Sequence, residues 1–413
     1  MRIAFISEAL PYLPSAGGFR LYGANLIRIL SQNHAIDLIS FVRDDDQQHL
    51  DWPRQYCASV NTIPGDRGNL SHRIANVGFA HLWGKPLTGR KQLATLLRSA
   101  MGARAWDVLH IEGEYTGGLI PPDLPIAKVL SLHDSWTLRC EEMLQCVRSS
   151  REKLYYAFLK QHKRRYERLV LPRFEKCTVV AGRDLQEVRK TAPRADIELI
   201  PYGTDTEYFH PLSVQKEPAT LVFHSHLGYA PNIEAALEFA DEIFPQIRQQ
   251  IPNAIFHLVG AKPVSEIHEL ARRPGIRLSP DLPDLRASVC SASIYVCAIR
   301  HGTGLKSKML EAMAMRMPIV AYHPGSTVGI DCAHGQHLLA AENPKEFADH
   351  VLNLLRHPEL AERLAQAARQ LVCEKYSWES RATAYECLYQ QAIEKRRNGG
   401  RVSARSSQST FRE

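Results

Sequence analysis

Short runs of Val, Ile and Leu alternate with longer amphipathic stretches along most of the chain. This pattern is typical of parallel β-α-β units whose strands are buried on both faces. A first series of apolar runs predicts strands at Arg2–Ser7, Ala35–Phe41, Asp107–Ile111, Ala127–Leu132, Cys177–Ala181 and Ile197–Pro201. A second series predicts strands at Thr220–His224, Ala254–Val259, Ser293–Cys297 and Pro318–Tyr322. Two separate series predict an α/β protein with two doubly wound domains.

The periodicity breaks at Tyr208–Pro218, where prolines and polar residues favour a linker. Helices are predicted beyond it, at Asn232–Gln250, Pro344–Arg356, Pro358–Cys373 and Trp378–Lys395. We therefore expect domains at residues 1–207 and 208–375 and a C-terminal helix at 376–397 that crosses back to the first domain. The Ser- and Arg-rich residues 398–413 lack apolar side chains to bury, which predicts a disordered tail.

Composition narrows the class of protein. The 413 residues are 45% hydrophobic and 23% charged, which is typical of a globular chain. No apolar run reaches the roughly 18 residues that a membrane-spanning helix needs. The nine cysteines include no C-x-x-C pair, which argues against a disulfide framework or a zinc site. We expect a cytoplasmic protein with free thiols, no metal and no cofactor.

The net charge of +7 is unevenly distributed. The segment Arg148–Lys176 holds ten basic and three acidic residues, so its net charge of +7 equals that of the whole chain. It also carries Leu, Tyr and Phe side chains. One interpretation is an amphipathic helix that lies on an anionic membrane, on the inner face of the cytoplasmic membrane. The other is a helix that packs its aromatic side chains on the first domain while its arginines extend into solvent. A nucleic-acid partner is not expected, because no nucleic-acid-binding motif accompanies the charge.

Two glycine-containing loops are candidates for binding an anion. Gly17 and Gly18 follow the first predicted strand and lead into a helix that carries Arg20. The second loop is stronger, because the segment His301–Pro318 places two glycines before a helix that is expected to start near Leu305. The amino end of that helix favours a diphosphate, and its lysines and glutamate could hold phosphate oxygens and vicinal hydroxyls; they are Lys306, Lys308 and Glu311. The alternatives are an ordinary turn for the first loop and a solvated glutamate on a helix surface.

The second loop resembles the donor-site motif of the family-4 retaining glycosyltransferases, glycosyl transferases group 1, in the variant G-x-G-x-x-x-K-x-x-E-A-M-A. Three further segments are similar to that family's pattern, and the resemblance extends over nearly the whole chain. They are Ile200–Pro211 at the entry to the second domain, Phe223–Asn232 in its first strand and loop, and Tyr376-Ser-Trp378 near the end.

The resemblance implies a GT-B fold, in which two Rossmann-like domains face a central cleft. It implies transfer of a sugar, with retention, from a UDP- or GDP-linked donor to a glycan or lipid-linked acceptor, in bacterial exopolysaccharide or cell-surface glycan biosynthesis. The implied catalytic residues are His133 and Glu311, with His133 at the sugar and Glu311 at the nucleotide ribose. The implied donor-binding residues are Gly17, Gly18, Arg20, Asn232, Thr303, Gly304, Leu305, Lys306, Lys308 and Glu311.

His133 also follows a predicted strand directly, where doubly wound sheets place their ligands. The chain departs from the family pattern at Thr303, where the first of two glutamates is usual, and at His224 and His226, which occupy the neighbourhood of a usual Arg/Lys pair. The missing acid at Thr303 leaves open a non-catalytic subunit that binds a nucleotide sugar. A third hypothesis is a sugar-nucleotide epimerase or a phosphorylase on the same fold.

Overall fold

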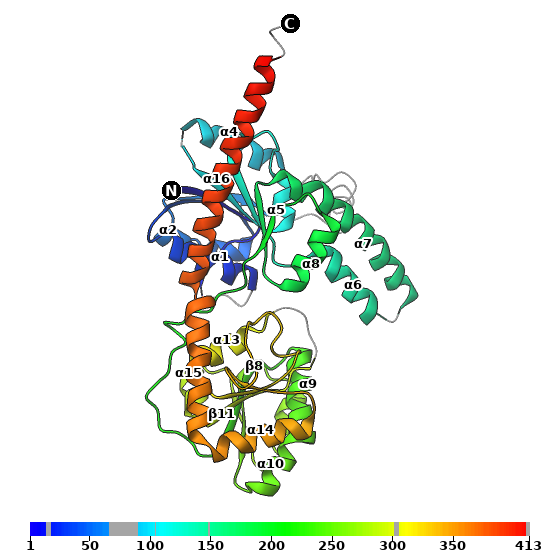
Figure 1. Ribbon diagram of the computed structural model, residues 1–413, viewed down its shortest axis with the longest axis vertical. Helices are drawn as coiled ribbons and strands as arrows, with labels where there is room; N and C mark the ends of the chain where they lie inside the picture. Colours follow the sequence, from blue (N-terminus) through cyan, green and yellow to red (C-terminus); the bar gives the residue numbers. More distant parts are fainter. Residues whose placement is uncertain (14–17, 66–89, 104, 148, 301–304, 410–413) are drawn as a thin grey trace. The chain divides into compact units, whose positions relative to one another are not determined.

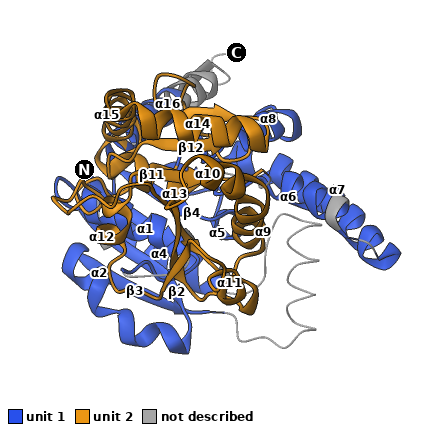
Figure 2. Cartoon of the chain, turned by 90° about the horizontal axis from the view of Figure 1, so that it is seen from below, with its two compact units in different colours: residues 1–201, 381–413 blue, residues 202–380 orange. Residues whose placement is uncertain are grey.

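The computed structural model describes residues 1–13, 18–65, 90–103, 105–147, 149–300 and 305–409. Within them the chain forms two compact units (Figures 1 and 2). The first unit comprises Met1–Pro201 together with Arg381–Glu413, and the second comprises Tyr202–Ser380. No helix within these ranges has the length and apolar character needed to cross a bilayer.

The first unit contains a parallel sheet in the order β3-β2-β1-β4-β5-β6-β7. Its strands are β1 (Arg2–Ser7), β2 (Ala35–Val42), β3 (Ser59–Pro64), β4 (Val108–Glu112), β5 (Ala127–Ser131), β6 (Lys176–Val179) and β7 (Ile197–Leu199). Every residue of β4 and β5 is buried, as expected for strands covered by helices on both faces.

The helices of this unit connect successive strands. They are α1 (Gly18–Leu30), the 3-10 turn η1 (Asp44–His49), α2 (Asp51–Tyr56), α4 (Arg90–Ala103), α5 (Glu114–Leu119), α6 (Trp136–Cys146), α7 (Ser150–Val170), the 3-10 turn η2 (Leu171–Arg173) and α8 (Gly182–Thr191). The last helix, α16 (Trp378–Ser409), begins in the second unit and belongs to the first from Arg381 onward.

Helix α16 is fixed to the first unit by two buried tyrosines. The Tyr385 hydroxyl lies 2.8 Å from the Tyr22 hydroxyl and 3.0 Å from those of Ser131 and Thr178. The Tyr389 hydroxyl lies 2.8 Å from Nδ1 of His110 in β4. Residues near the end of the chain therefore complete the interior of the first unit.

The second unit contains a parallel sheet in the order β10-β9-β8-β11-β12-β13. Its strands are β8 (Thr220–His226), β9 (Ile255–Ala261), β10 (Ile276–Pro280), β11 (Ile294–Cys297), β12 (Ile319–Tyr322) and β13 (Leu339–Ala341). Its helices are α9 (Ala230–Glu238), the π-helical turn η3 (Phe239–Ile243), α10 (Phe244–Gln250), α11 (Ser265–Leu270), α12 (Arg286–Ser291), α13 (Ser307–Ala314), α14 (Pro344–Arg356) and α15 (Pro358–Lys375).

Two parallel-sheet units confirm the α/β class that the alternating pattern predicts. Three strands were not predicted: β3, β10 and β13. Strands β3 and β10 are only partly buried and mix polar with apolar residues, and β13 is a Leu-Ala-Ala segment without β-branched side chains. Helix α16 is assigned as far as Ser409, and the disorder that the composition predicts for residues 398–413 stays a prediction.

Candidate functional site

In both sheets the strand order reverses once, between β1 and β4 in the first unit and between β8 and β11 in the second. Ligands of doubly wound sheets bind beyond the carboxyl ends of the strands at such a reversal. Each unit places a cluster of polar side chains there. We call them the β8 cluster (His224, Asn232, Lys308 and Glu311) and the β4 cluster (Glu8, Glu112, Glu114 and His133).

The β8 cluster is built around a carboxylate–imidazole pair. Nε2 of His224, near the end of β8, lies 2.8 Å from Oε2 of Glu311 in the second turn of α13. The His224 side chain is 3% exposed, whereas that of Glu311 is 21% exposed. A buried imidazole needs a hydrogen-bond partner, and Glu311 supplies it while keeping its other oxygen for a further donor. Nδ1 of His224 and Oγ of Ser225 are buried and have no partner among the described residues.

Lys308 lies beside this pair. Its ammonium group donates to Oδ1 of Asn232 and lies 5.3 Å from the centroid of the Phe223 ring. Nδ2 of Asn232 donates to the carbonyl of His226 at 2.8 Å, so both ends of the buried Asn232 amide bond within the protein. Asn232 therefore positions Lys308. Burial lowers the pKa of Lys308.

Helix α13 begins at Ser307, two residues later than the sequence predicts. Its cap residue is Lys306, whose side chain makes no capping hydrogen bond to the helix. The first amides of a helix lack partners within the helix, and the helix dipole attracts anions to this end. Lys308 and the amino end of α13 can therefore bind phosphate oxygens, and Leu305 directly precedes them.

The β4 cluster holds His133 in one orientation. Nε2 of His133 lies 2.6 Å from Oε1 of Glu112, and Oε2 of Glu112 lies 2.9 Å from Nε2 of His110. An ionised carboxylate only accepts hydrogen bonds, so both Nε2 atoms carry protons and Nδ1 of His110 accepts from the Tyr389 hydroxyl. Burial by itself would raise the pKa of Glu112, but the hydrogen bonds from His110 and His133 lower it. Glu112 is thus a buried anion that can stabilise positive charge on His133.

Three further ionisable groups, Glu8, Glu114 and Lys163, interact with one another, and Glu8 also interacts with His133. Burial raises the pKa of Glu8, which follows β1, to about 7. Burial, together with the charge of Glu167, raises the pKa of Glu114 well above its usual value, and neither Glu114 oxygen has a partner among the described residues. Burial lowers the pKa of Lys163, which lies over the Trp136 ring, to about 8. Glu8 and Lys163 can therefore exchange protons near neutral pH.

Glycine at position 113 makes room for Glu8. Gly113 has φ +93°, and a Cβ atom there would lie 2.4 Å from Oε2 of Glu8. The backbone conformation therefore favours glycine, and a larger residue would also displace the Glu8 carboxylate.

The other residues that the sequence singled out are placed as follows. Arg20 forms an ion pair with Asp46 and lies 5.3 Å from the Tyr12 ring centroid, so its charge is used within the first unit. Gly18 is the first residue of α1. Gly17, Thr303 and Gly304 lie outside the described residues.

The sequence analysis missed Glu8, Glu112 and Glu114, and it did not pair His224 with Glu311. The missed acids follow or end the predicted strands β1 and β4, so the rule that selected His133 would also have selected them. Among the described residues, no group of three or more His, Cys, Asp or Glu side chains is arranged to hold a metal ion.

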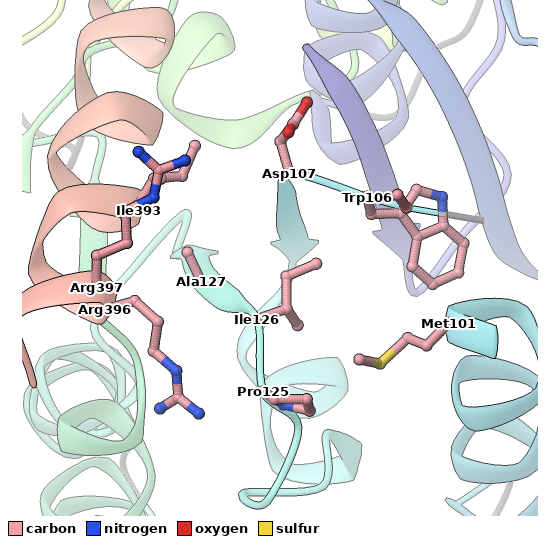
Figure 3. A pocket seen from close by; sticks show the side chains of 10 residues that line it. Met101, Trp106, Asp107, Pro125, Ile126, Ala127, Ile393, Arg396 and Arg397 are labelled. Carbon is pink, nitrogen blue, oxygen red and sulfur yellow. The ribbon is translucent and has the colours of Figure 1, made fainter. Parts of the chain in front are cut away.

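A cavity of about 260 Å³ lies elsewhere in the first unit (Figure 3). It lies next to Asp107 and Ala127, at the amino ends of β4 and β5, and Trp106, Arg396 and Arg397 also line it. The β4 cluster lies at the carboxyl ends of the strands, whereas the cavity lies at their amino ends. The cavity is therefore separate from the candidate site.

Comparisons with known proteins connect the second unit to a family. Residues 218–357 match the family model described as "Glycosyl transferases group 1". This range contains all four residues of the β8 cluster. A curated relative, described as an uncharacterized 44.6 kDa protein in the cps region of Klebsiella pneumoniae, is 21% identical over 390 residues, which cover 91% of this chain and 96% of the relative.

Solved structures resemble the whole chain. A sucrose-phosphate synthase from Thermosynechococcus elongatus has a TM-score of 0.66 at 18% identity and covers 95% of this chain and 99% of its own. A glycosyltransferase from Rickettsia africae ESF-5 has a TM-score of 0.64 at 13% identity, covering 94% and 98%. The HepE protein of Anabaena, solved in complex with UDP, has a TM-score of 0.61 at 12% identity, covering 94% and 100%. The chain therefore has the GT-B fold, and its residues 218–357 match the model of the group 1 glycosyl transferases.

Proposed function

We propose that the protein is a retaining glycosyltransferase that moves a sugar from a nucleoside-diphosphate donor to a glycan or lipid-linked acceptor, in the assembly of a cell-surface polysaccharide. The observation that carries the proposal is the β8 cluster. A partly exposed carboxylate and a lysine, each fixed by a buried partner, lie at the strand reversal inside the range that matches the family model.

The β8 cluster suits a nucleoside diphosphate. The partly exposed carboxylate of Glu311 can accept hydrogen bonds from the two vicinal hydroxyls of a ribose. Lys308 and the first amides of α13 can bind the diphosphate without a metal ion. A structural relative solved with UDP supports a uridine donor as the first to test, with GDP-linked donors as the alternative.

The β4 cluster suits the sugar end of the reaction. During transfer the bond between the anomeric carbon and the diphosphate breaks, the acceptor hydroxyl oxygen bonds to that carbon, and the hydroxyl proton is released. Positive charge develops at the anomeric carbon, and oriented polar groups stabilise such a state. His133, oriented by the buried Glu112, is the group in this cluster that we assign to the sugar.

The same geometry also fits a non-catalytic subunit that binds a nucleotide sugar, and Thr303 in place of the family's usual glutamate favours that alternative. Binding and turnover distinguish the two. A protein that binds a nucleotide sugar but transfers no sugar to any acceptor would be a binding subunit.

The test begins with a thermal-shift screen of UDP, GDP and ADP and of their sugar conjugates, because a ligand that binds the folded state raises its apparent stability. Release of nucleoside diphosphate and the anomeric configuration of the product are then measured with the selected donor. Lys308→Met should abolish the shift, whereas Lys345→Met, the same change at an exposed position of α14, should not. If no nucleotide stabilises the wild-type protein, the proposal is wrong.

A further inference from the structure

Helix α7 has one face packed on the first unit and one face exposed. Tyr166, Glu167 and Val170 are buried on the packed face, and Lys163 lies over Trp136 of α6. Glu167 accepts hydrogen bonds from the hydroxyls of Ser135, Thr137 and Thr191. The packed face therefore accounts for few of the apolar side chains of the helix.

The outer face of α7 carries large apolar side chains in solvent. Leu154 is 75% exposed, Tyr155 55%, Phe158 61% and Leu169 47%. The spacing of the first three places them on one stripe of the helix surface. A cluster of exposed large apolar residues on one helix marks a surface that contacts something else.

The same face is strongly cationic. The exposed charged residues of α7 are Arg151, Glu152, Lys153, Arg164, Arg165 and Arg168. The other two cations are engaged within the first unit, since Lys160 lies 3.1 Å from Glu141 and Lys163 is packed against Trp136. The exposed surface of α7 thus presents five cations with a single acid.

The hairpin of α6 and α7 extends away from the sheet of the first unit in both views (Figures 1 and 2). The chain runs outward along α6 and returns along α7, so Leu154 and Tyr155 lie close to the outer end of the hairpin. The apolar stripe therefore lies on a projection, with Arg164, Arg165 and Arg168 nearer the sheet.

We propose that the outer face of α7 lies on a membrane surface that contains anionic lipids. Leu154, Tyr155 and Phe158 insert at the boundary between headgroups and acyl chains, and the five cations contact lipid phosphates. Charge complementarity selects this partner. The core of a protein–protein interface contains few charged residues. On α7, by contrast, Arg151 and Arg165 lie on the same side of the helix as the apolar stripe. This mixture of cations and apolar side chains suits the headgroup layer of an anionic membrane. The proposal concerns a surface separate from the β8 cluster and does not depend on the transferase activity.

Co-sedimentation of the full-length protein with lipid vesicles tests the proposal. Vesicles of phosphatidylcholine alone are compared with vesicles that also contain phosphatidylglycerol, at low and at high salt. The wild-type protein should bind the anionic vesicles and be released by salt. Replacing Arg164, Arg165 and Arg168 with Gln should weaken this binding on the order of 100-fold, since each cation near the surface contributes about one factor of five.

A second variant and a matched control keep the test decisive. Leu154→Ser with Phe158→Ser should weaken vesicle binding without changing net charge, because it removes insertion alone. The control replaces the exposed Arg272, Lys345 and Arg363 of the second unit with Gln, the same change in charge, and should bind like the wild type. Circular dichroism and melting temperature establish that each variant is folded.

Three outcomes would overturn the proposal. They are equal binding of the wild type to neutral and anionic vesicles, equal loss of binding in the control variant and the α7 variant, and binding to an RNA or a protein without binding to vesicles.

Discussion

Replacing Glu311 should lower both the stability of the second unit and its affinity for a nucleotide, and the two effects can be measured separately. His224 is 3% exposed, its Nε2 bonds to Glu311, and its Nδ1 has no partner among the described residues. Glu311→Ala therefore leaves a buried imidazole with no hydrogen bond, which costs about 1–3 kcal/mol. For a unit of this size each kcal/mol lowers the melting temperature by about 2–4 °C, so we expect a fall of about 2–12 °C.

Glu311→Gln is the matched variant. The amide oxygen can still accept from Nε2 of His224, so the change replaces a charged acceptor with a neutral one and costs about 1 kcal/mol. For ligand binding, losing two hydrogen bonds to a carboxylate costs about 3 kcal/mol or more, so Glu311→Ala should weaken nucleotide binding at least about 100-fold. Glu311→Gln should lie between Glu311→Ala and the wild type.

A double-mutant cycle separates the two effects. Combining His224→Leu with Glu311→Ala removes both partners, so stability should recover relative to Glu311→Ala while the affinity stays low. Urea denaturation measures the stability, and titration calorimetry with the selected nucleoside diphosphate measures the affinity. The reasoning fails if Glu311→Ala is as stable as the wild type, or if the double variant is no more stable than Glu311→Ala. Unchanged affinity in Glu311→Ala would remove this residue from the binding site.

Three other predictions concern the β4 cluster. Gly113→Ala should lower the free energy of unfolding by about 1–3 kcal/mol because of its backbone conformation, and further because the new Cβ atom meets the Glu8 carboxylate. Adding Glu8→Ala should restore the stability lost through this contact, as measured by urea denaturation. A double variant no more stable than Gly113→Ala would contradict the contact. Because burial raises the pKa of Glu8 to about 7, the folded protein binds a proton that the unfolded chain loses near pH 4.5, so wild-type stability should fall as pH rises through this window. The melting temperature of Glu8→Gln should therefore rise relative to the wild type between pH 5 and pH 8, and a constant difference would argue against burial of this carboxyl. Glu112→Gln should reduce turnover by up to ~100-fold through misplacement of His133 while nucleotide affinity is retained, and unchanged turnover would remove Glu112 from a positioning role.

Elements of secondary structure could be predicted from the sequence where the composition of a single segment identifies them. Short, mainly apolar runs such as those of β1, β4 and β5 identify their strands, because a strand buried on both faces is rich in apolar residues. Half-buried strands such as β3 and β10 lack that signal. The position of Glu311 in α13 followed from a local motif.

The contacts that fix the candidate site could not be predicted in this way. His224 and Glu311 are 87 residues apart, and His110 and Tyr389 are 279 residues apart. Each side chain by itself resembles an ordinary polar residue, and only the pairing of strands and helices brings them together. Arg20 illustrates the same limit, because its partner Asp46 lies in the separate element η1.

Because α16 follows the second unit in the sequence, the first unit cannot be completed during translation before the second unit has been synthesised. Ser131, Thr178 and His110 bond to Tyr385 and Tyr389, which the ribosome adds after the whole of the second unit. At about 5–20 residues per second, synthesis of the roughly 190 residues between Pro201 and Tyr389 takes ~10–40 s. During that delay the nascent first unit keeps unpaired polar groups in its interior, and the second unit can finish folding before the first. A chain that ends before Tyr385 therefore lacks the hydroxyl groups that pair with Ser131, Thr178 and His110, and the interior of its first unit stays incomplete.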